Sequence, residues 1–266
     1  MKLKVVTSRD NPLFKRLKAL ASSSQARRKE GLSILDGAHL VEACMRAWGA
    51  PELLAVSESG IQRPEIARLA AAAGGTVLQF PDPLFEALST VLHGAGIVAA
   101  VHTPRHGMPE SISGDCLLLD HLQDPGNLGS LLRSAAAAGV TQVFCSPGTV
   151  YAWSPKVPRA GQGAHFGLTI VEGVELLSVI ARLAVPLLAT TSHNAARLYD
   201  LDLARPVAWL FGNEGAGVAP ALLEHAACRV GIPMPGGAES LNVAAAGAIC
   251  MFEAVRQRTP TLKRIR

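Results

Sequence analysis

Short apolar runs alternate with amphipathic or alanine-rich stretches along most of this 266-residue chain. Such a chain can bury its apolar runs as strands and cover them with the intervening helices. In the first half, the expected strands are 32–36, 52–57, 75–79 and 96–102, and the expected helices are 38–48, 62–72 and 83–91. In the second half, strands are expected at 115–120, 141–146, 168–171, 186–190, 206–211 and 229–232, and helices at 128–138, 174–183, 218–226 and 241–257.

A polar segment punctuated by proline and glycine, 103–111, separates the two halves. We therefore expect an α/β fold of two domains with mainly parallel sheets. The smaller domain would span residues 1–103 and the second residues 114–266, with a linker over 104–113.

Composition narrows the class of protein. Hydrophobic residues make up 49% of the chain and charged residues 17%, which excludes a disordered chain. No apolar run reaches the length of a membrane span, and the apolar stretch near the N-terminus is too short for a signal peptide. The five cysteines form no C-x-x-C pair, and the eight histidines form no H-x-x-x-H pair beside a carboxylate. We therefore expect a soluble cytoplasmic protein with no disulfide, metal or membrane partner.

The net charge of +4 hides an uneven distribution. Residues 1–30 carry nine Lys and Arg against two acids, residues 254–266 carry five bases and no acid, and the middle of the chain is acidic. Basic segments attract phosphate backbones. For the C-terminal segment alone, a solubility role is favoured.

In the N-terminal cluster, a helix orders the charges. Asn11 can cap it, Pro12 suits its first position, and an apolar stripe follows at Phe14, Leu17, Leu20 and Ala21. This leaves Lys15, Arg16 and Lys18 largely facing water, and Arg27 and Arg28 lie just beyond the helix. We expect these five cations to contact nucleic acid.

Three loops in the second half share one design, in which an apolar strand leads through glycine and small polar residues into a helix. Ligands of α/β sheets bind outside the carboxyl ends of the strands, so we expect the ligand site there. The first loop, 120–133, contains a Pro-Gly turn, a candidate helix cap in Asn127, and Arg133 within the following helix. Arg133 is either a surface residue or an anion ligand, and the residues alone slightly favour the former.

The second loop, 207–217, has the order G-x-x-G-x-G, which matches neither the dinucleotide fingerprint nor a P-loop. Glu214 within it would repel a bare phosphate and suits a cationic or hydroxyl-bearing ligand. In the third loop, 230–243, Ser240 and Asn242 precede an apolar helix. We expect a capping role for Ser240 more than for Asn242, which would lie inside the first turn.

Taken together and in this order, three segments resemble the SpoU/TrmH family of SPOUT RNA methyltransferases: DPGNLGSLLRSAAAAGV (124–140), LFGNEGAGV (210–218) and IPMPGGAESLNVAAAGAI (232–249). The N-terminal segments Ser8–Pro12, Arg27–Gly31 and Leu35–Gly37 resemble the ribosomal-protein-like substrate-binding domain that precedes many ribosomal RNA 2′-O-methyltransferases. Asp36 stands where that pattern more often has Glu.

The resemblance implies a C-terminal domain with a deep trefoil knot. It also implies transfer of a methyl group from S-adenosylmethionine (AdoMet) to a ribose 2′-hydroxyl of RNA, with large-subunit ribosomal RNA favoured. AdoMet would be held chiefly by backbone groups around Leu210, Gly212, Ile232, Met234 and Leu241. The implied catalytic positions are Asn127, Arg133, Glu214, Ser240 and Asn242.

Among these positions, Arg133 would position the reacting ribose and phosphate, and whether it also helps to remove the proton of the hydroxyl stays open. The side chains of Asn127, Ser240 and Asn242 would orient the ribose and Arg133. The resemblance further implies a homodimer through the C-terminal domain, with RNA contact by Arg159 across the dimer. Gly161 stands where the family commonly has Ser, so no hydroxyl role is expected there.

Three other functions stay open at this point. They are a tRNA ribose 2′-O-methyltransferase, a non-catalytic RNA-binding factor in ribosome assembly, and a nicotinamide-dependent dehydrogenase. The separate N-terminal domain favours ribosomal RNA over tRNA, and the five matching catalytic positions disfavour a loss of catalysis. The glycine order and the missing acidic residue after a first βαβ unit disfavour the dehydrogenase.

Overall fold

The computed structural model describes residues 2–89, 94–192 and 195–259. The chain folds into two compact units. Unit 1 comprises residues 1–105 and 152–166, and unit 2 comprises residues 106–151 and 167–266. The grouping of 152–166 with unit 1 differs from the single domain expected over 114–266. The proposed linker and its boundaries stay predictions.

Unit 1 is built on a mixed five-stranded sheet with the order β1-β4-β3-β5-β2. The strands are β1 (Lys2–Val5), β2 (Leu32–Asp36), β3 (Leu53–Ser57), β4 (Thr76–Phe80) and β5 (Ile97–His102). β1, β4 and β3 run parallel, whereas β5 pairs antiparallel with both β3 and β2. β1 was not predicted because this edge strand has only four residues and is exposed along its whole length, so it has no buried face to mark it.

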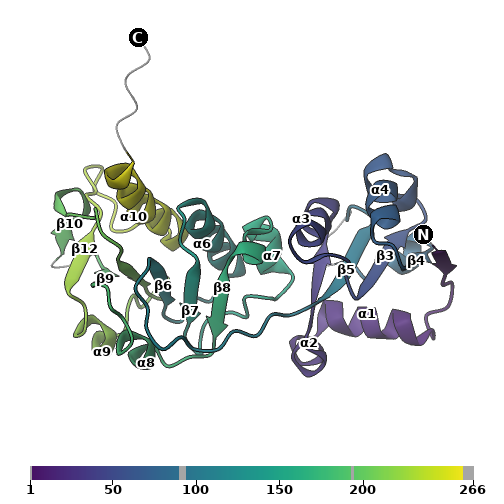
Figure 1. The fold of residues 1–266 in the computed structure, drawn as a ribbon, viewed down its shortest axis with the longest axis horizontal. Coiled ribbons are helices and arrows are strands. Elements are labelled where there is room, and N and C mark those ends of the chain that lie inside the picture. Colours follow the sequence, from purple (N-terminus) through teal and green to yellow (C-terminus); the bar gives the residue numbers. More distant parts are fainter. Residues whose placement is uncertain (1, 90–93, 193–194, 260–266) are drawn as a thin grey trace, which may run out of the picture. The chain divides into compact units, whose positions relative to one another are not determined.

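Helices cover both faces of this sheet (Figure 1). They are α1 (Pro12–Ser22), α2 (Ser24–Glu30), α3 (Ala38–Trp48), α4 (Pro64–Ala72) and α5 (Asp82–Phe85), with a 3₁₀ turn at Gly60–Gln62. α1 begins as expected, because the Asn11 side chain accepts a 2.9 Å hydrogen bond from the Leu13 N–H. Its apolar stripe shares a core with Ile34, whereas α3 and α4 share the opposite core with Leu35. Successive side chains of β2 thus pack into the cores on opposite faces of the sheet.

Aromatic contacts explain why residues 152–166 belong to unit 1. The ring of Trp48 lies 4.8 Å from Phe166 and 5.7 Å from Trp153, measured between ring centroids. His165 is fully buried, its Nε2 hydrogen-bonded to the Ala152 carbonyl at 2.9 Å. This segment includes the short helix α7 (Lys156–Gly161), which was not predicted from the sequence.

Unit 2 is a seven-stranded sheet with the order β10-β12-β9-β11-β6-β7-β8, and every pair in it is parallel. Its strands are β6 (Cys116–Leu119), β7 (Gln142–Cys145), β8 (Thr169–Glu172), β9 (Leu187–Thr190), β10 (Ala196–Arg197), β11 (Ala208–Phe211) and β12 (Cys228–Gly231). The prediction of an α/β fold with a mainly parallel sheet is therefore confirmed for unit 2, whereas the sheet of unit 1, which was also expected to be mainly parallel, is mixed. The strands read as short apolar runs because both faces of the sheet are covered.

Two short helices, α8 (Leu176–Ile180) and α9 (Pro220–Leu223), lie on one face of this sheet, and α6 (Pro125–Ala137) and α10 (Val243–Arg258) lie on the other (Figure 1). α6 and α10 pack against each other at Gly247, where an added Cβ would come within 2.1 Å of Leu131 Cδ1. A 3₁₀ turn at Leu198–Asp200 also contacts α10. In the part of the chain that the structure describes, none of the helices combines the length and the apolar composition of a membrane span.

Candidate active site

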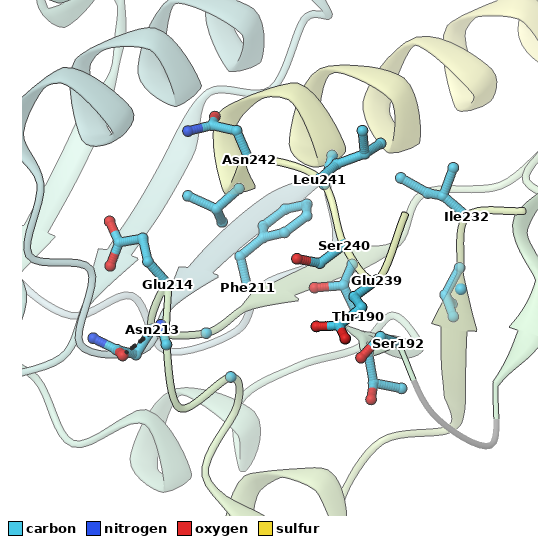
Figure 2. Close-up of a pocket in the computed structure, with 18 of the residues that line it drawn as sticks. Thr190, Ser192, Phe211, Asn213, Glu214, Ile232, Glu239, Ser240, Leu241 and Asn242 are labelled. Carbon is cyan, nitrogen blue, oxygen red and sulfur yellow. Dashed lines mark hydrogen bonds between the residues drawn. The ribbon is translucent and has the colours of Figure 1, made fainter. Parts of the chain in front are cut away.

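A cavity of about 940 Å³ lies at the carboxyl ends of β9, β11 and β12 in unit 2. The loops that leave these strands, together with the start of α10, form its wall (Figure 2). This is the edge at which parallel sheets bind ligands. Its apolar wall includes Phe211, Val230, Ile232, Met234, Leu241 and Val243, and its polar wall includes Asn127, Thr190, Ser192, Glu214, Glu239, Ser240 and Asn242.

Three polar side chains at this cavity form one continuous hydrogen-bond chain, which we call the amide chain. Asn242 Nδ2 donates to Asn127 Oδ1 at 2.7 Å, and Asn127 Nδ2 donates to Glu214 Oε1 at 3.0 Å. The three residues come from the starts of α10 and α6 and from the loop after β11. Side chains separated by up to 115 residues are thus held together.

The end of the amide chain at α10 fixes its direction. Asn242 Oδ1 accepts hydrogen bonds from the Ala244 and Ala245 N–H groups at 2.9 and 3.3 Å, which makes Asn242 the N-cap of α10. Because its Oδ1 is engaged there, only its Nδ2 can face Asn127. The expectation that Ser240 rather than Asn242 caps this helix was wrong, since the helix begins two residues later than predicted.

A second capping expectation also requires correction. The N-cap of α6 is Asp124, whose side chain accepts a 2.7 Å hydrogen bond from the Asn127 N–H, and Pro125 follows in the first turn. Asn127 therefore lies inside the helix, not at its cap. Because Asp124 takes the capping role, the Asn127 side chain is left for the amide chain.

The carboxylate at the other end of the amide chain is held ionised. Burial raises the pKa of Glu214, but hydrogen bonds from the Asn127 amide and from the backbone N–H groups of Glu214, Gln123 and Asp124 together lower it below its ordinary value. The bonds from Gln123 and Asp124 are 3.3 Å long. Glu214 therefore ties the loop after β11 to the loop after β6.

The loop after β11 is closed by backbone hydrogen bonds between residues on either side of Glu214. Asn213 and Gly217 exchange backbone hydrogen bonds of 3.0 and 2.9 Å, and Asn213 Oδ1 accepts from the Gly215 and Ala216 N–H groups. A Cβ on Gly212 would lie 2.1 Å from the Gly217 carbonyl carbon, so this position requires glycine. Gly217 has a positive φ of 72°, which also favours glycine. These two glycines give the loop its tight shape.

The structure brings most of the predicted AdoMet-binding positions to the cavity. Gly212, Ile232, Met234 and Leu241 line it. Leu210 does not, since its side chain is fully buried in the core of unit 2 and its carbonyl accepts a 3.1 Å hydrogen bond from Thr190 Oγ1. Whether these positions bind AdoMet stays a prediction.

Arg133 stands apart from the other predicted catalytic residues, of which Asn127, Glu214, Ser240 and Asn242 all line the cavity. Arg133 is exposed on α6, about 9 Å along the helix axis from Asn127. Within the part of the chain that the structure describes, its guanidinium has no hydrogen bond or ion pair. It is thus available to an anion from solvent.

Five polar residues of the cavity were not predicted from the sequence: Thr190, Thr191, Ser192, Asn213 and Glu239. Thr190 ends β9 and Ser192 follows it, so the rule that ligands bind at carboxyl ends of strands could have found both. Glu239 immediately precedes Ser240 in the third loop. No group of three or more His, Cys, Asp or Glu side chains with metal-binding geometry occurs among the described residues.

The cations of unit 1 that we expected at a nucleic-acid surface differ in accessibility. Lys15 pairs with Asp10 at 2.8 Å, and Arg16 pairs with Glu30 at 2.6 Å. Arg27 is buried, and its guanidinium donates to the Leu20 carbonyl at 2.6 Å, so it joins α2 to the end of α1 rather than facing a ligand. The structure therefore removes Arg27 from the expected RNA contacts. The exposed candidates are Lys15, Lys18, Arg28 and, on α7, Arg159.

Comparison with known proteins identifies the family. The model of the SpoU rRNA Methylase family matches residues 116–252. The 23S rRNA (guanosine(2553)-2′-O)-methyltransferase RlmP of Bacillus subtilis is 32% identical over 94% of this chain and 98% of its own. A 23S rRNA (uridine(2479)-2′-O)-methyltransferase of Streptomyces viridochromogenes is 30% identical over 95% of this chain and 92% of its own.

Solved structures agree with the sequence relatives. The crystal structure of an RNA 2′-O ribose methyltransferase matches with a TM-score of 0.83 and 34% identity, over 96% of this chain and 99% of the other. An AdoMet-bound rRNA methyltransferase from Sinorhizobium meliloti matches with a TM-score of 0.83 and 27% identity, over 97% and 99%. The chain belongs to the SpoU rRNA methylase family, as the sequence resemblance predicted.

Proposed function

We propose that this protein transfers a methyl group from AdoMet to a ribose 2′-hydroxyl of ribosomal RNA, with RNA of the large subunit as the favoured substrate. The observation that carries the proposal is the amide chain in the wall of the cavity. It unites three of the five predicted catalytic side chains, and a family relative covering nearly the whole chain is named for this reaction on 23S rRNA.

The cavity fits AdoMet in size and chemistry. Its volume of about 940 Å³ lies at the upper end of the range usual for small-molecule sites. Ile232, Met234 and Leu241 offer an apolar wall for an adenine ring, and Glu214 and Glu239 offer negative charge. Among the described residues that line it, none is Lys, Arg or His, which suits a ligand with a positive centre.

AdoMet supplies an electrophilic methyl group on a positively charged sulfur. The nucleophile is the ribose 2′-oxygen, which would form the new C–O bond as the C–S bond breaks. The electron pair of the C–S bond stays on the sulfur, which leaves as part of S-adenosylhomocysteine and is then uncharged, and the hydroxyl proton passes to solvent water. The amide chain contributes orientation, because each of its polar atoms has one fixed donor or acceptor role. Ser240 also lines the cavity, and Asn242 caps α10 in its place, so the Ser240 hydroxyl can orient the ribose as well.

Arg133 is the residue that we assign to the substrate phosphate and ribose. Its guanidinium is exposed, and it lies on the helix whose first turn holds Asn127. A guanidinium stays protonated in proteins, so we assign it an anion-positioning role rather than that of the base. Lys15, Lys18, Arg28 and Arg159 would add contacts to the RNA backbone.

We further propose a homodimer through the C-terminal domain and a trefoil knot formed by the second and third loops. Exposed apolar side chains on unit 2 support the dimer: Phe252 on α10 is 45% exposed and Tyr199, in the 3₁₀ turn that contacts α10, is 51% exposed. A cytoplasmic location accords with the cysteines, all five of which are free thiols.

Transfer of labelled methyl groups tests the proposed reaction. The protein would be incubated with AdoMet carrying a tritiated methyl group and, separately, with 23S rRNA, 16S rRNA and bulk tRNA. The expected product is a 2′-O-methylated nucleoside from 23S rRNA, recovered as a dinucleotide that resists alkaline hydrolysis. Label in tRNA alone would favour the tRNA alternative, and RNA binding without label in any substrate would favour the assembly factor.

A further inference from the structure

Two carboxylates line the cavity, and they differ in what they already bind. Both oxygens of Glu214 accept hydrogen bonds, Oε1 from Asn127 and Asp124 and Oε2 from Gln123. Glu239 has no hydrogen bond or ion pair with any residue that the structure describes. Glu214 thus serves the protein's own loops, whereas Glu239 can offer both oxygens to a ligand.

The surroundings of Glu239 favour a ligand group that donates hydrogen bonds. Glu239 lines the same cavity as Ser240, Thr190 and Ser192 (Figure 2). Thr190 already donates its hydroxyl hydrogen to the Leu210 carbonyl, so towards the cavity its oxygen can only accept. A carboxylate that shares a cavity with an accepting hydroxyl, with no cation among the described lining residues, attracts positive charge.

We propose that Glu239 binds the positively charged part of the methyl donor and selects charged donors over uncharged adenosine analogues. The inference rests on the proposed function, because it takes AdoMet as the occupant of the cavity. AdoMet carries two positive groups, the sulfonium and the ammonium of its methionine part. Both groups are cations, and either one could pair with the Glu239 carboxylate.

The expected size of the effect is moderate. A hydrogen bond to a charged group contributes more than a neutral one, but Glu239 is exposed at a cavity open to solvent, where charge interactions are screened. We expect the substitution Glu239→Gln, which keeps the shape and removes the charge, to weaken binding of a charged donor about tenfold.

Calorimetric titration of the full-length protein tests this with three ligands. AdoMet carries both positive groups, S-adenosylhomocysteine carries only the ammonium, and 5′-methylthioadenosine carries neither. The matched control is Glu224→Gln, which removes a negative charge from an exposed position at the end of α9, in the same unit but away from the cavity. Thermal melting of both variants checks that they fold.

Two results would support the proposal. If Glu239→Gln weakens AdoMet and S-adenosylhomocysteine about tenfold and changes 5′-methylthioadenosine less than twofold, the ammonium is the partner. If only AdoMet weakens, the sulfonium is the partner. In both cases Glu224→Gln should bind all three ligands like the unmodified protein.

The proposal is overturned if Glu239→Gln binds all three ligands unchanged, if it weakens all three equally, or if Glu224→Gln has the same effect. These outcomes leave the proposed function intact, because the unmodified protein still binds the donor. If the unmodified protein binds neither AdoMet nor S-adenosylhomocysteine, both the proposed function and the role of Glu239 fail. If Glu239→Gln does not fold, Glu239→Asp replaces it, which keeps the charge but shortens its reach. It should weaken AdoMet more than 5′-methylthioadenosine, and an equal effect on the two ligands would overturn the proposal.

Discussion

Asn242 donates its side-chain amide to Asn127 Oδ1 at 2.7 Å, and this bond joins the first turns of α10 and α6 at the cavity. The same Asn242 side chain caps α10 through its oxygen. One residue therefore starts a helix and orients a predicted catalytic amide. The two roles use different atoms, so they can be separated by substitution.

Asn242→Asp should separate them. The carboxylate keeps an oxygen for the Ala244 N–H, and Asp caps helices as well as Asn does, so we expect the melting temperature to change by no more than about 2 °C. The donor to Asn127 is lost, and methyl transfer should fall at least about 100-fold. Asn242→Ala, which removes both roles, should also lose about 1 kcal/mol of stability. Wild-type turnover by Asn242→Asp would contradict the orienting role.

Gly212→Ala should destabilise the protein because the new Cβ would overlap the Gly217 carbonyl carbon. We expect a loss of roughly 1–3 kcal/mol in the free energy of unfolding, measured by urea denaturation, and weaker binding of AdoMet. Gly236→Ala is the matched control, since nothing lies within 4 Å of its Cβ position and its φ is not positive. Equal stability of the two variants would show that the loop after β11 has room for a side chain at position 212, which would contradict the close contact between Gly212 and Gly217.

Arg133→Ala should abolish methyl transfer without loss of stability. Its side chain is exposed on α6, and surface substitutions usually change stability by less than about 0.5 kcal/mol. AdoMet affinity should stay within twofold because Arg133 does not line the cavity. Turnover and calorimetric titration on the same preparation measure both. Near-normal turnover would remove Arg133 from the proposed site.

Mild acid should destabilise unit 1 through His165. Burial lowers the pKa of His165 from 6.5 to about 4, although its hydrogen bond to the Ala152 carbonyl acts in the opposite direction. Between these values the unfolded chain binds a proton that the folded protein does not. Above pH 6.5 neither state binds this proton, so His165 does not make stability depend on pH there. Below pH 6.5 the free energy of unfolding falls as the pH drops towards 4, by roughly 3 kcal/mol at most.

His165→Phe tests this prediction, because it keeps a ring beside Trp153 and cannot be protonated. The substitution also removes the hydrogen bond to the Ala152 carbonyl and alters packing, and both change the stability at neutral pH. The absolute stabilities of the two proteins are therefore not the test. The relevant quantity is the change between pH 7.5 and pH 5 in urea denaturation, which should be smaller in the variant. The same pH dependence in both proteins would contradict a neutral buried His165.

The alternation of strands and helices could be predicted from the sequence because apolar periodicity reports burial. β2 and α3 have the predicted bounds, and α1 has its predicted cap. Exposed or short elements gave too weak a pattern: β1 is exposed along its length, and α7 has only six residues. The contacts of residues 152–166 depend on tertiary packing of Trp48, which no local pattern reports.

The members of the candidate site could be predicted from the family resemblance, but not their arrangement. Asn127, Glu214 and Asn242 lie far apart in the chain, and only the structure shows one hydrogen-bond chain among them. The caps were misassigned because several polar residues near each helix start can cap it, and backbone geometry decides between them. Arg27 was expected among the accessible cations because sequence cannot show that its guanidinium binds carbonyls at the end of α1.

The strictest test of the proposed function is to map 2′-O-methylation in ribosomal RNA by mass spectrometry, in cells with and without this gene. We expect one methylated ribose in 23S rRNA to disappear on deletion and to return with the intact gene, but not with a gene encoding Arg133→Ala. An unchanged 2′-O-methylation pattern in all ribosomal RNA after deletion would contradict the proposed function.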